Sequence, residues 1–230
     1  MKQIVTRGIV LSRIDFQEAD RILTIITPDQ GKIRLMARGV RKVKSKLAGG
    51  IELFSLSQIT FIPGRGEIKT LVSSRLQTHF GNIVKDINRT MLGYELLKRI
   101  NKLTEDATEP AYFELLARTL EGLDDETLSS EALEFWFNMQ LLKITGHPPN
   151  LRTTSGEQTL TKGKNYNFDY SSMTFEPSSD GTLTANHIKL MRLGTNSSRP
   201  AIFTKVKGSA KLLPELLILS KTLLSSQVRI

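Results

Sequence analysis

The stretch RILTIITPDQGKIRLMAR, residues 21–38, decides the fold class of the first part of the chain. Its first half is rich in β-branched residues and ends at Pro28-Asp29-Gln30-Gly31, which is typical of a tight turn. In its second half, apolar and polar residues alternate. One face carries Ile33, Leu35 and Ala37, and the other carries Lys32, Arg34, Met36 and Arg38. The pattern therefore predicts two strands joined by a turn.

Three further segments of the first 76 residues predict strands, at 4–14, 53–62 and 67–76. A turn at 63–66 joins the last two, and we expect Ile68, Val72 and Leu76 to share one face of the last strand. Three aromatic residues, Phe16, Phe54 and Phe61, are expected in the core. Five strands without an intervening amphipathic helix predict a small closed barrel.

From residue 81 onward the apolar residues follow a helical period. We expect helices at 83–103, from Pro110 to about 123, at 130–145, at 184–193 and at 214–226. In the first of these, Val84, Ile87 and Met91 are expected to share the apolar stripe with Leu92, Leu96 and Ile100. The stretch 150–183 is polar, with one short strand around 166–175. The sequence predicts an α+β chain: a five-stranded barrel domain at 1–80, then a helical domain at 81–230 with a loop-rich insertion at 150–183.

Composition narrows the possible functions. With 230 residues, 39% hydrophobic and 24% charged, the chain has the composition of an ordinary globular protein. It contains no cysteine and three widely separated histidines, so we expect no metal site and no cofactor. The N-terminus lacks the pattern of a signal peptide, and no apolar run is long enough to span a bilayer. We therefore expect a cytoplasmic protein without a membrane partner.

The net charge of +9 is concentrated at the two ends of the sequence. Residues 1–80 hold 14 Lys and Arg against 6 Asp and Glu, whereas residues 81–150 hold 7 against 12. The densest basic segment follows the strand at 32–38. Because neighbouring cations repel unless an anion lies among them, this segment predicts contacts with a nucleic-acid backbone. The expected phosphate contacts are Lys32, Arg34, Arg38, Arg41, Lys42, Lys44 and Lys46, with Lys69 and Arg75 as weaker candidates. A solvated loop is the alternative.

Other functions remain open from the residues alone. The carboxylates Asp15, Glu18 and Asp20 form either the metal site of a nuclease or a turn in which Asp20 or Glu18 pairs with Arg21. We favour the turn, because two-metal chemistry needs ligands that converge from several segments and no second acidic cluster follows. The barrel could also bind RNA, since the contacts that distinguish RNA leave no short motif. An adaptor whose helical domain binds only proteins is a third alternative.

The order of these features resembles the RecO recombination mediator family. The resemblance is carried by Gly8-Ile9-Val10-Leu11, Glu18-Ala19-Asp20-Arg21-Ile22-Leu23-Thr24, Ala37-Arg38-Gly39-Val40-Arg41, Ser45-Lys46-Leu47-Ala48-Gly49, Gly64-Arg65-Gly66-Glu67-Ile68 and, more loosely, Gly146-His147-Pro148-Pro149-Asn150-Leu151. It implies an oligonucleotide-binding (OB-fold) barrel followed by a helical domain. It also implies a non-enzymatic DNA repair protein of the bacterial cytoplasm, associated with the nucleoid. Such a protein binds single- and double-stranded DNA, anneals strands coated by single-strand-binding protein and, with RecR, helps to load RecA.

Two further expectations concern the rear of the chain. Many family members carry a four-cysteine zinc motif after the Pro-Asn-Leu block, but the segment from Arg152 onward has none, so we expect no structural zinc. The family also binds the acidic C-terminal tail of single-strand-binding protein. We expect Lys205, Lys207 and Lys211 to contribute to that site, together with Leu212, Leu213 and Leu216. A solvated loop beside a core helix is the alternative.

Overall fold

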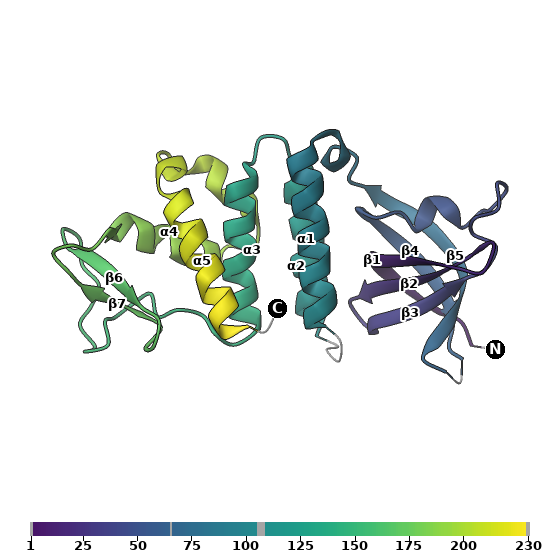
Figure 1. Cartoon of the computed structure of the whole chain (residues 1–230), viewed down its shortest axis with the longest axis horizontal. Helices are drawn as coiled ribbons and strands as arrows, with labels where there is room; N and C mark the ends of the chain where they lie inside the picture. The colour runs from purple at the N-terminus through teal and green to yellow at the C-terminus, as the bar shows by residue number, and fades with distance from the viewer. Residues whose placement is uncertain (1, 65, 105–108, 229–230) are drawn as a thin grey trace. The chain divides into compact units, whose positions relative to one another are not determined.

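Five strands close into a barrel over the first 80 residues, as the sequence predicts (Figure 1). In the computed structural model, which describes residues 2–64, 66–104 and 109–228, the strands are β1 (Ile4–Phe16), β2 (Asp20–Thr27), β3 (Gly31–Ala37), β4 (Ser55–Ile62) and β5 (Ile68–His79). The order around the barrel is β1-β2-β3-β5-β4; β3 and β5 are parallel and the other neighbours antiparallel. Residues 63–67 connect β4 and β5, and Arg65, which belongs to the turn expected at 63–66, lies outside the described residues.

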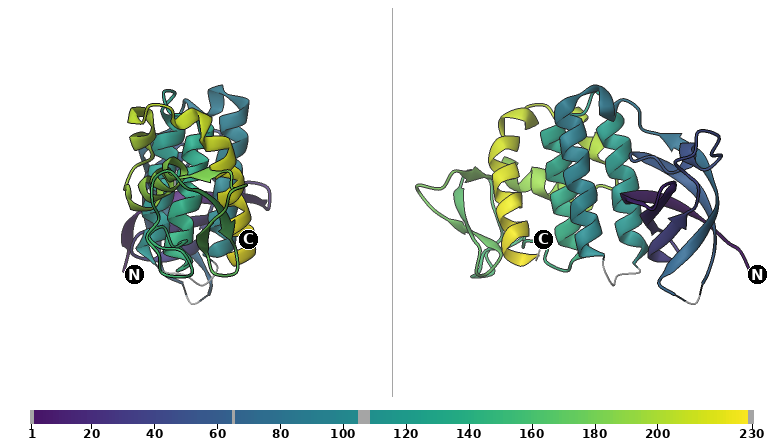
Figure 2. Two further views of the ribbon diagram at one scale, coloured as in Figure 1. Left: turned by 90° about the vertical axis from the view of Figure 1, so that its left-hand side faces the viewer. Right: turned by 45° about the vertical axis from the view of Figure 1, so that its right-hand side comes forward.

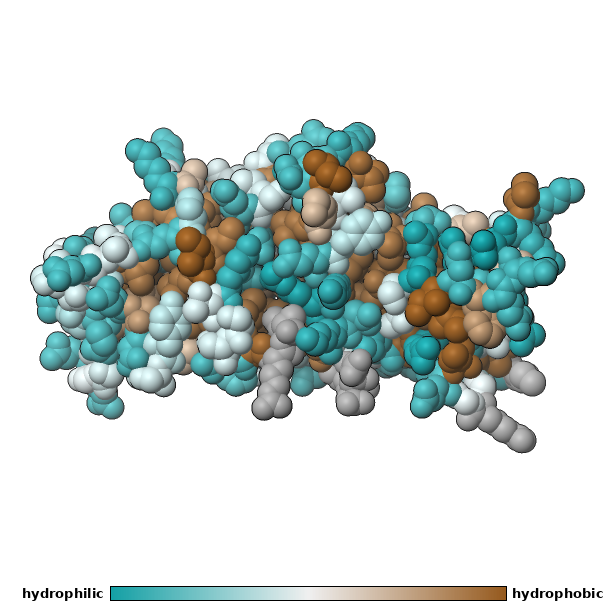
Figure 3. All heavy atoms as spheres, in the orientation of Figure 1, coloured by the Kyte–Doolittle hydropathy of each residue, from teal (hydrophilic) through white to brown (hydrophobic). Residues whose placement is uncertain are grey.

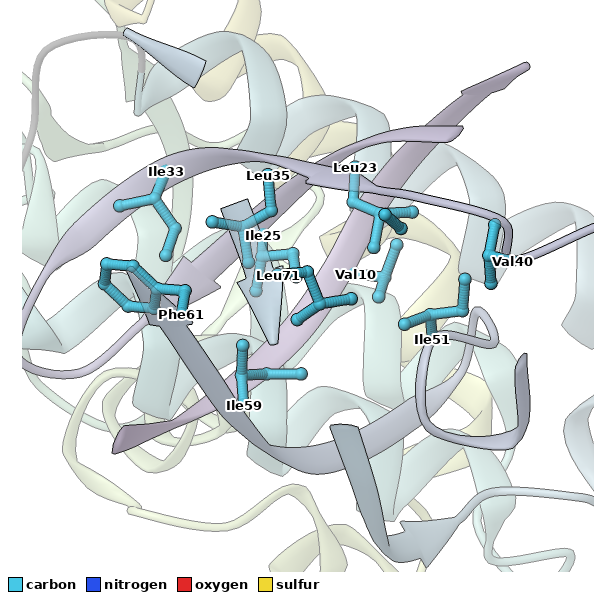
Figure 4. Packing of buried hydrophobic residues seen from close by; sticks show 11 residues of the cluster. Val10, Leu23, Ile25, Ile33, Leu35, Val40, Ile51, Ile59, Phe61 and Leu71 are labelled. Carbon is cyan, nitrogen blue, oxygen red and sulfur yellow. The ribbon is translucent and has the colours of Figure 1, made fainter. Parts of the chain in front are cut away.

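The barrel core confirms the predicted faces of β3. Ile33, Leu35 and Ala37 are buried, whereas Lys32, Arg34, Met36 and Arg38 are partly or fully exposed. Figure 4 shows the core side chains together: Val40 and Ile51 lie at one end, and Ile33 and Phe61 at the other. The two residues at the first end come from the segment after β3, which therefore closes that end of the barrel.

The predicted inner face of β5 is wrong. Leu71 is the buried apolar residue of this strand, whereas Val72 and Leu76 are exposed. The pairing between β4 and β5 shifts register between Thr60 and Phe61, so the alternation of the sequence does not continue across this point. A one-residue shift of register exchanges the two faces of a strand. The sequence of β5 contains no local pattern that predicts this shift.

Two helices belong to the same compact unit as the barrel, Met1–Asp125. They are α1 (Ile87–Leu103) and α2 (Pro110–Asp124), which pack against each other (Figure 2). The helix expected at 83–103 is interrupted: a short 3₁₀ turn, η2 (Ile83–Lys85), comes first, and Asp86 then caps α1 by accepting a hydrogen bond from Arg89 N. Val84 precedes this break, and Ile87 and Met91 lie on another face of α1 than Leu92, Leu96 and Ile100, so the first three are exposed and the last three form the buried stripe.

The second compact unit, Glu126–Ile230, is built around α3 (Ser130–Ile144). Both α4 (Ala185–Asn196) and α5 (Leu213–Gln227) pack against it, and two 3₁₀ turns, η3 (Pro200–Lys205) and η4 (Ser209–Lys211), connect them. Gly146 follows α3 with φ +82°, and Thr184 caps α4, both as the sequence predicts. The division of the chain into domains 1–80 and 81–230 stays a prediction.

The insertion at 150–183 holds more strand than we expected. A three-stranded sheet in the order β7-β6-β8 is formed by β6 (Asn165–Asp169), β7 (Thr174–Pro177) and β8 (Leu183–Thr184). Tyr166, Phe168 and Phe175 pack edge to face, and the Tyr166 hydroxyl donates to Thr161 O and accepts from Thr161 N. These aromatic side chains form the small core of the insertion at 150–183. No helix in the described residues is both long and apolar enough to cross a membrane.

Candidate nucleic-acid interface

The basic segment after β3 is fixed to the barrel at its first end. Gly39 adopts φ +62°, and its N–H donates to Asp20 Oδ1 at 2.7 Å. Arg41 N donates to Ala19 O at 2.9 Å, and the Val40 side chain is buried in the barrel core. The hairpin between β1 and β2 therefore sets the direction in which the segment leaves β3.

The second end of the segment is fixed to β5. The 3₁₀ turn η1 (Ala48–Gly50) lies so close to this strand that a Cβ on Gly50 would be 2.6 Å from Ser74 Oγ. The same hydroxyl donates to Leu47 O at 2.9 Å. We call residues 38–50 the basic loop; both of its ends are held by hydrogen bonds and packing, so it is not a free linker.

Between these anchors the cations of the basic loop are exposed. They are Arg38, Arg41, Lys42, Lys44 and Lys46, and Val43 among them is also fully exposed. Arg41 Nε lies 3.5 Å from Asp15 Oδ2, so part of its charge is compensated. Within the described part of the chain, the other four cations have no carboxylate within salt-bridge distance. The loop is an anchored array of positive charge in which, among the described residues, Arg41 is the one cation paired with a carboxylate.

The other predicted phosphate contacts lie at different places on the barrel. Arg34 points outward from the middle of β3, on the same face as Arg38. Lys32 lies six residues from Arg38, roughly 20 Å along an extended strand, and its Nζ donates to Asn101 O of α1 at 2.7 Å. Lys69 Nζ lies 5.4 Å from the centre of the buried Phe61 ring, at the end of the core opposite Val40. Arg75 is exposed on β5, beside Gln58 of β4. Arg34 thus shares the outer face of β3 with Arg38, whereas Lys32 is bonded to α1. Lys69 pairs with Leu35 of β3, and Arg75 directly follows Ser74, the β5 residue that holds the second end of the basic loop.

The acidic cluster forms a turn in which the carboxylates bind basic and backbone groups. Arg21 Nε donates to Asp15 Oδ1 at 2.7 Å, and this hydrogen bond, assisted by the charges of Arg41 and Arg21, lowers the pKa of the Asp15 carboxyl. The salt bridge of the turn therefore involves Asp15, where we expected Glu18 or Asp20. Asp20 instead accepts from Gly39 N. No group of three carboxylate or histidine side chains in the described residues is placed to bind a metal ion.

Sequence reasoning missed part of the outer surface beside the loop. Phe16, which we expected in the core, is 40% exposed at the end of β1. Ile14 shares its face and is also exposed. The sequence could have indicated that Ile14 and Phe16 share a face, because they lie two positions apart in a strand, next to a hairpin, and such side chains point the same way.

The rear lysines lie on the short turns that precede α5. Lys205, Lys207 and Lys211 are all exposed. Leu213 and Leu216 are buried in the second unit, so only Leu212 of the three neighbouring leucines is partly accessible beside them. The expected leucine-lined pocket is therefore reduced to a basic surface next to the start of α5.

A closed five-stranded barrel with an exposed basic loop is an architecture typical of oligonucleotide-binding proteins. Family models match both parts of the chain: recombination protein O N terminal at residues 1–80, and recombination protein O C terminal at residues 84–228. The chain therefore belongs to the recombination protein O family.

Curated relatives agree with this assignment. A protein of Dehalococcoides mccartyi named DNA repair protein RecO is 33% identical over 218 residues, which cover 92% of this chain and 85% of the relative. A protein of the same name from a second strain of that species is 31% identical over the same shares of the two chains. The relative from Desulfatibacillum aliphaticivorans, also named DNA repair protein RecO, is 32% identical over 66% of this chain and 60% of its own length.

Proposed function

We propose that this protein binds single- and double-stranded DNA through the basic loop and anneals complementary strands. The observation that carries the proposal is the anchored array of Arg38, Lys42, Lys44 and Lys46, which lack carboxylate partners in the described residues. Each phosphate that these cations neutralise releases counterions, and this release supplies most of the affinity of non-specific DNA binding. Arg34 extends the contact along β3, and Arg75 and Lys69 contribute less.

Annealing follows from the same electrostatics. Two complementary strands repel each other through their phosphates, and a protein that neutralises both at once lowers the barrier to pairing. This activity needs no bond to be made or broken, so we propose a mediator that is not an enzyme. Because the chain belongs to the recombination protein O family, we extend the proposal to its partners: DNA coated by single-strand-binding protein, the protein RecR, and through it the loading of RecA.

The test of the DNA contact uses two double variants and one control. Lys42→Ala with Lys44→Ala should flatten the log–log dependence of single-strand affinity on salt by roughly 1.4, which corresponds to two lost phosphate contacts. Arg38→Ala with Arg41→Ala should flatten it less, because Asp15 already compensates part of the Arg41 charge. Lys205→Ala with Lys207→Ala removes the same charge from the second unit and should leave the slope nearly unchanged. If both loop variants bind and anneal like the parent protein, the basic loop is only a solvated loop.

The mediator function is tested by annealing of complementary oligonucleotides coated with single-strand-binding protein, in the presence of a chelator and without ATP. Faster pairing supports the proposal. Cleavage of the strands on addition of magnesium, abolished by Asp20→Ala, would instead support the nuclease. A protein that does not bind nucleic acid at moderate salt is an adaptor, and one that binds RNA much more tightly than DNA of the same sequence is an RNA-binding protein.

We propose that Lys205, Lys207 and Lys211 bind the acidic C-terminal tail of single-strand-binding protein. The three lysines are exposed within seven residues of one another, next to the partly exposed Leu212. Replacing all three by alanine should weaken binding of a tail peptide and leave binding of free DNA unchanged. The Lys42→Ala, Lys44→Ala variant is the reciprocal control, because it should weaken DNA binding only. Unchanged peptide affinity in the triple variant would exclude these lysines from the site.

A further inference from the structure

An apolar strip crosses the outer face of the barrel over β1, β2 and β3. The register pairs Ile14 with Ile22 and Ile22 with Met36, so these three side chains form one row across the strands. Phe16 lies two residues beyond Ile14 on the same face of β1. We call these four residues the outer strip. Leu23, next to Ile22, and Leu35 and Ala37, which flank Met36, point into the core, so Ile22 and Met36 point outward. Ile14 pairs with Ile22 and therefore lies on the same outer face.

The outer strip is open, although apolar side chains on the same face of β2 are covered further along the strand. Ile14 is 57% exposed and Phe16 is 40% exposed, and Ile22 and Met36 are partly exposed. Ile26, four residues after Ile22 on this face, is only 2% exposed, and α2 packs against β2. Figure 3 shows apolar surface over these strands with hydrophilic surface around it. Exposed apolar side chains gathered in this way mark an interaction site.

Positive charge borders the strip on β3. Arg34 and Arg38 precede and follow Met36 by two residues each, so all three side chains leave the strand on the same side. Asp20 lies at the end of the strip near Phe16, but its Oδ1 accepts from Gly39 N of the basic loop. The surface therefore offers apolar contact between cations. That combination matches a single nucleic-acid strand, whose bases have apolar faces and whose backbone carries one negative charge per nucleotide.

We propose that the outer strip binds the unpaired bases of single-stranded DNA while Arg34 and Arg38 hold the adjacent phosphates. This inference rests on the proposed DNA binding and adds a contact that duplex DNA cannot make, because its bases are stacked on each other. Phe16 supplies a ring for stacking, and Ile14, Ile22 and Met36 supply aliphatic surface on which any base can lie. The protein would then hold single strands with their bases on the barrel and release them as pairing buries those bases.

The experiment compares three ligands: an oligothymidine, an abasic oligonucleotide of the same length, and a duplex. The unaltered protein should bind the oligothymidine more tightly than the abasic strand. Ile14→Thr with Phe16→Ala should weaken oligothymidine binding by about tenfold, the effect expected from loss of roughly 50 Å² of apolar contact. Binding of the abasic strand and of the duplex should not change, nor should the salt dependence. Val5→Thr with Val72→Thr is the matched control, because Val5 is 55% exposed on β1 and Val72 is 38% exposed on β5, both outside the strip.

The outcomes separate this inference from the proposed function. Equal affinity of the unaltered protein for the oligothymidine and the abasic strand would overturn the inference without any variant, and so would a strip variant no weaker than the control. In both cases, salt-dependent binding of the duplex would still support the proposed function. Absence of binding to all three ligands at moderate salt would overturn both. Circular dichroism of the variants should match that of the parent protein, because the replaced side chains are exposed.

Discussion

At the scale of single residues, we expect His187 to make the stability of the second unit depend on pH. It is the third residue of α4 and only 4% exposed, and its Nδ1 accepts a hydrogen bond from Thr184 N at 3.0 Å. Its Nε2 lies 3.2 Å from Glu215 Oε2 of α5. Burial lowers the pKa of His187, and this effect outweighs the raising effect of Glu215. The neutral ring with its proton on Nε2 satisfies both contacts, since Nδ1 can then accept from Thr184 N and Nε2 can donate to Glu215.

The lowered pKa gives a stability prediction with a definite sign. Below the ordinary histidine pKa of about 6.5, the unfolded chain takes up a proton that folded His187 resists, so stability falls as pH falls through this range. His187→Gln keeps a side-chain acceptor of the kind found in capping boxes and removes the titration. Thermal unfolding at pH 7.5 and 5.5 should therefore show a smaller loss for His187→Gln than for the parent protein. His187→Ala, which also loses the cap, should cost about 1 kcal/mol or more at both pH values. An equal loss in the parent and the glutamine variant would contradict this assignment.

At the scale of elements, the basic loop depends on the close approach of η1 to β5. Gly50→Ala would place a methyl group 2.6 Å from Ser74 Oγ and 2.8 Å from the Ser74 carbonyl carbon. Because backbone atoms cannot move aside cheaply, we expect a loss of about 1–3 kcal/mol in the free energy of unfolding. DNA affinity should also fall, since the anchor positions the loop cations. Gly49→Ala is the matched control, because no atom lies within 4 Å of its added Cβ. Denaturant unfolding and oligonucleotide binding measure both effects, and identical behaviour of the two variants would show that the anchor is not needed.

The elements also show what the sequence could predict. The faces of β3 followed from its alternation, because that strand has one side on the core throughout. The start of α2 at Pro110 and the cap of α4 at Thr184 followed from local chemistry. The inner face of β5 could not be predicted in this way, because the register shift at Thr60 depends on how β5 pairs with β4.

In the candidate nucleic-acid interface, too, local features can be predicted from the sequence and long-range contacts cannot. The cations of the basic loop are visible in the sequence as a cluster. Their anchors, Ser74 to Leu47 and Asp20 to Gly39, join residues 27 and 19 positions apart, and only the folded barrel brings them together. The outer strip is likewise formed by three strands at once, so its members look unrelated in the sequence.

At the scale of the whole molecule, the packing of α1 and α2 bears on where the first domain ends. Phe54 of the barrel is 2% exposed, and a Cβ on Gly93 of α1 would lie 2.7 Å from its ring. Tyr94 packs edge to face on the same ring at 5.1 Å between centroids. Asn82 N donates to Asp124 Oδ1 at 2.7 Å, which ties the end of α2 to the segment after the barrel. These contacts place both helices in one unit with the barrel.

A pair of fragments decides between a boundary near residue 80 and one after Asp125. We expect residues 1–125 to unfold cooperatively and to bind single strands with the salt dependence of the full chain. Residues 1–80 should be much less stable, because removal of α1 and α2 uncovers Phe54 and Ile26, at about 2 kcal/mol for each buried side chain. That loss is a large part of the 5–15 kcal/mol that stabilises a typical domain. Urea unfolding followed by circular dichroism measures the difference. Equal midpoints for the two fragments would place the boundary near residue 80, as the sequence predicts, and would mean that the barrel folds without its helices.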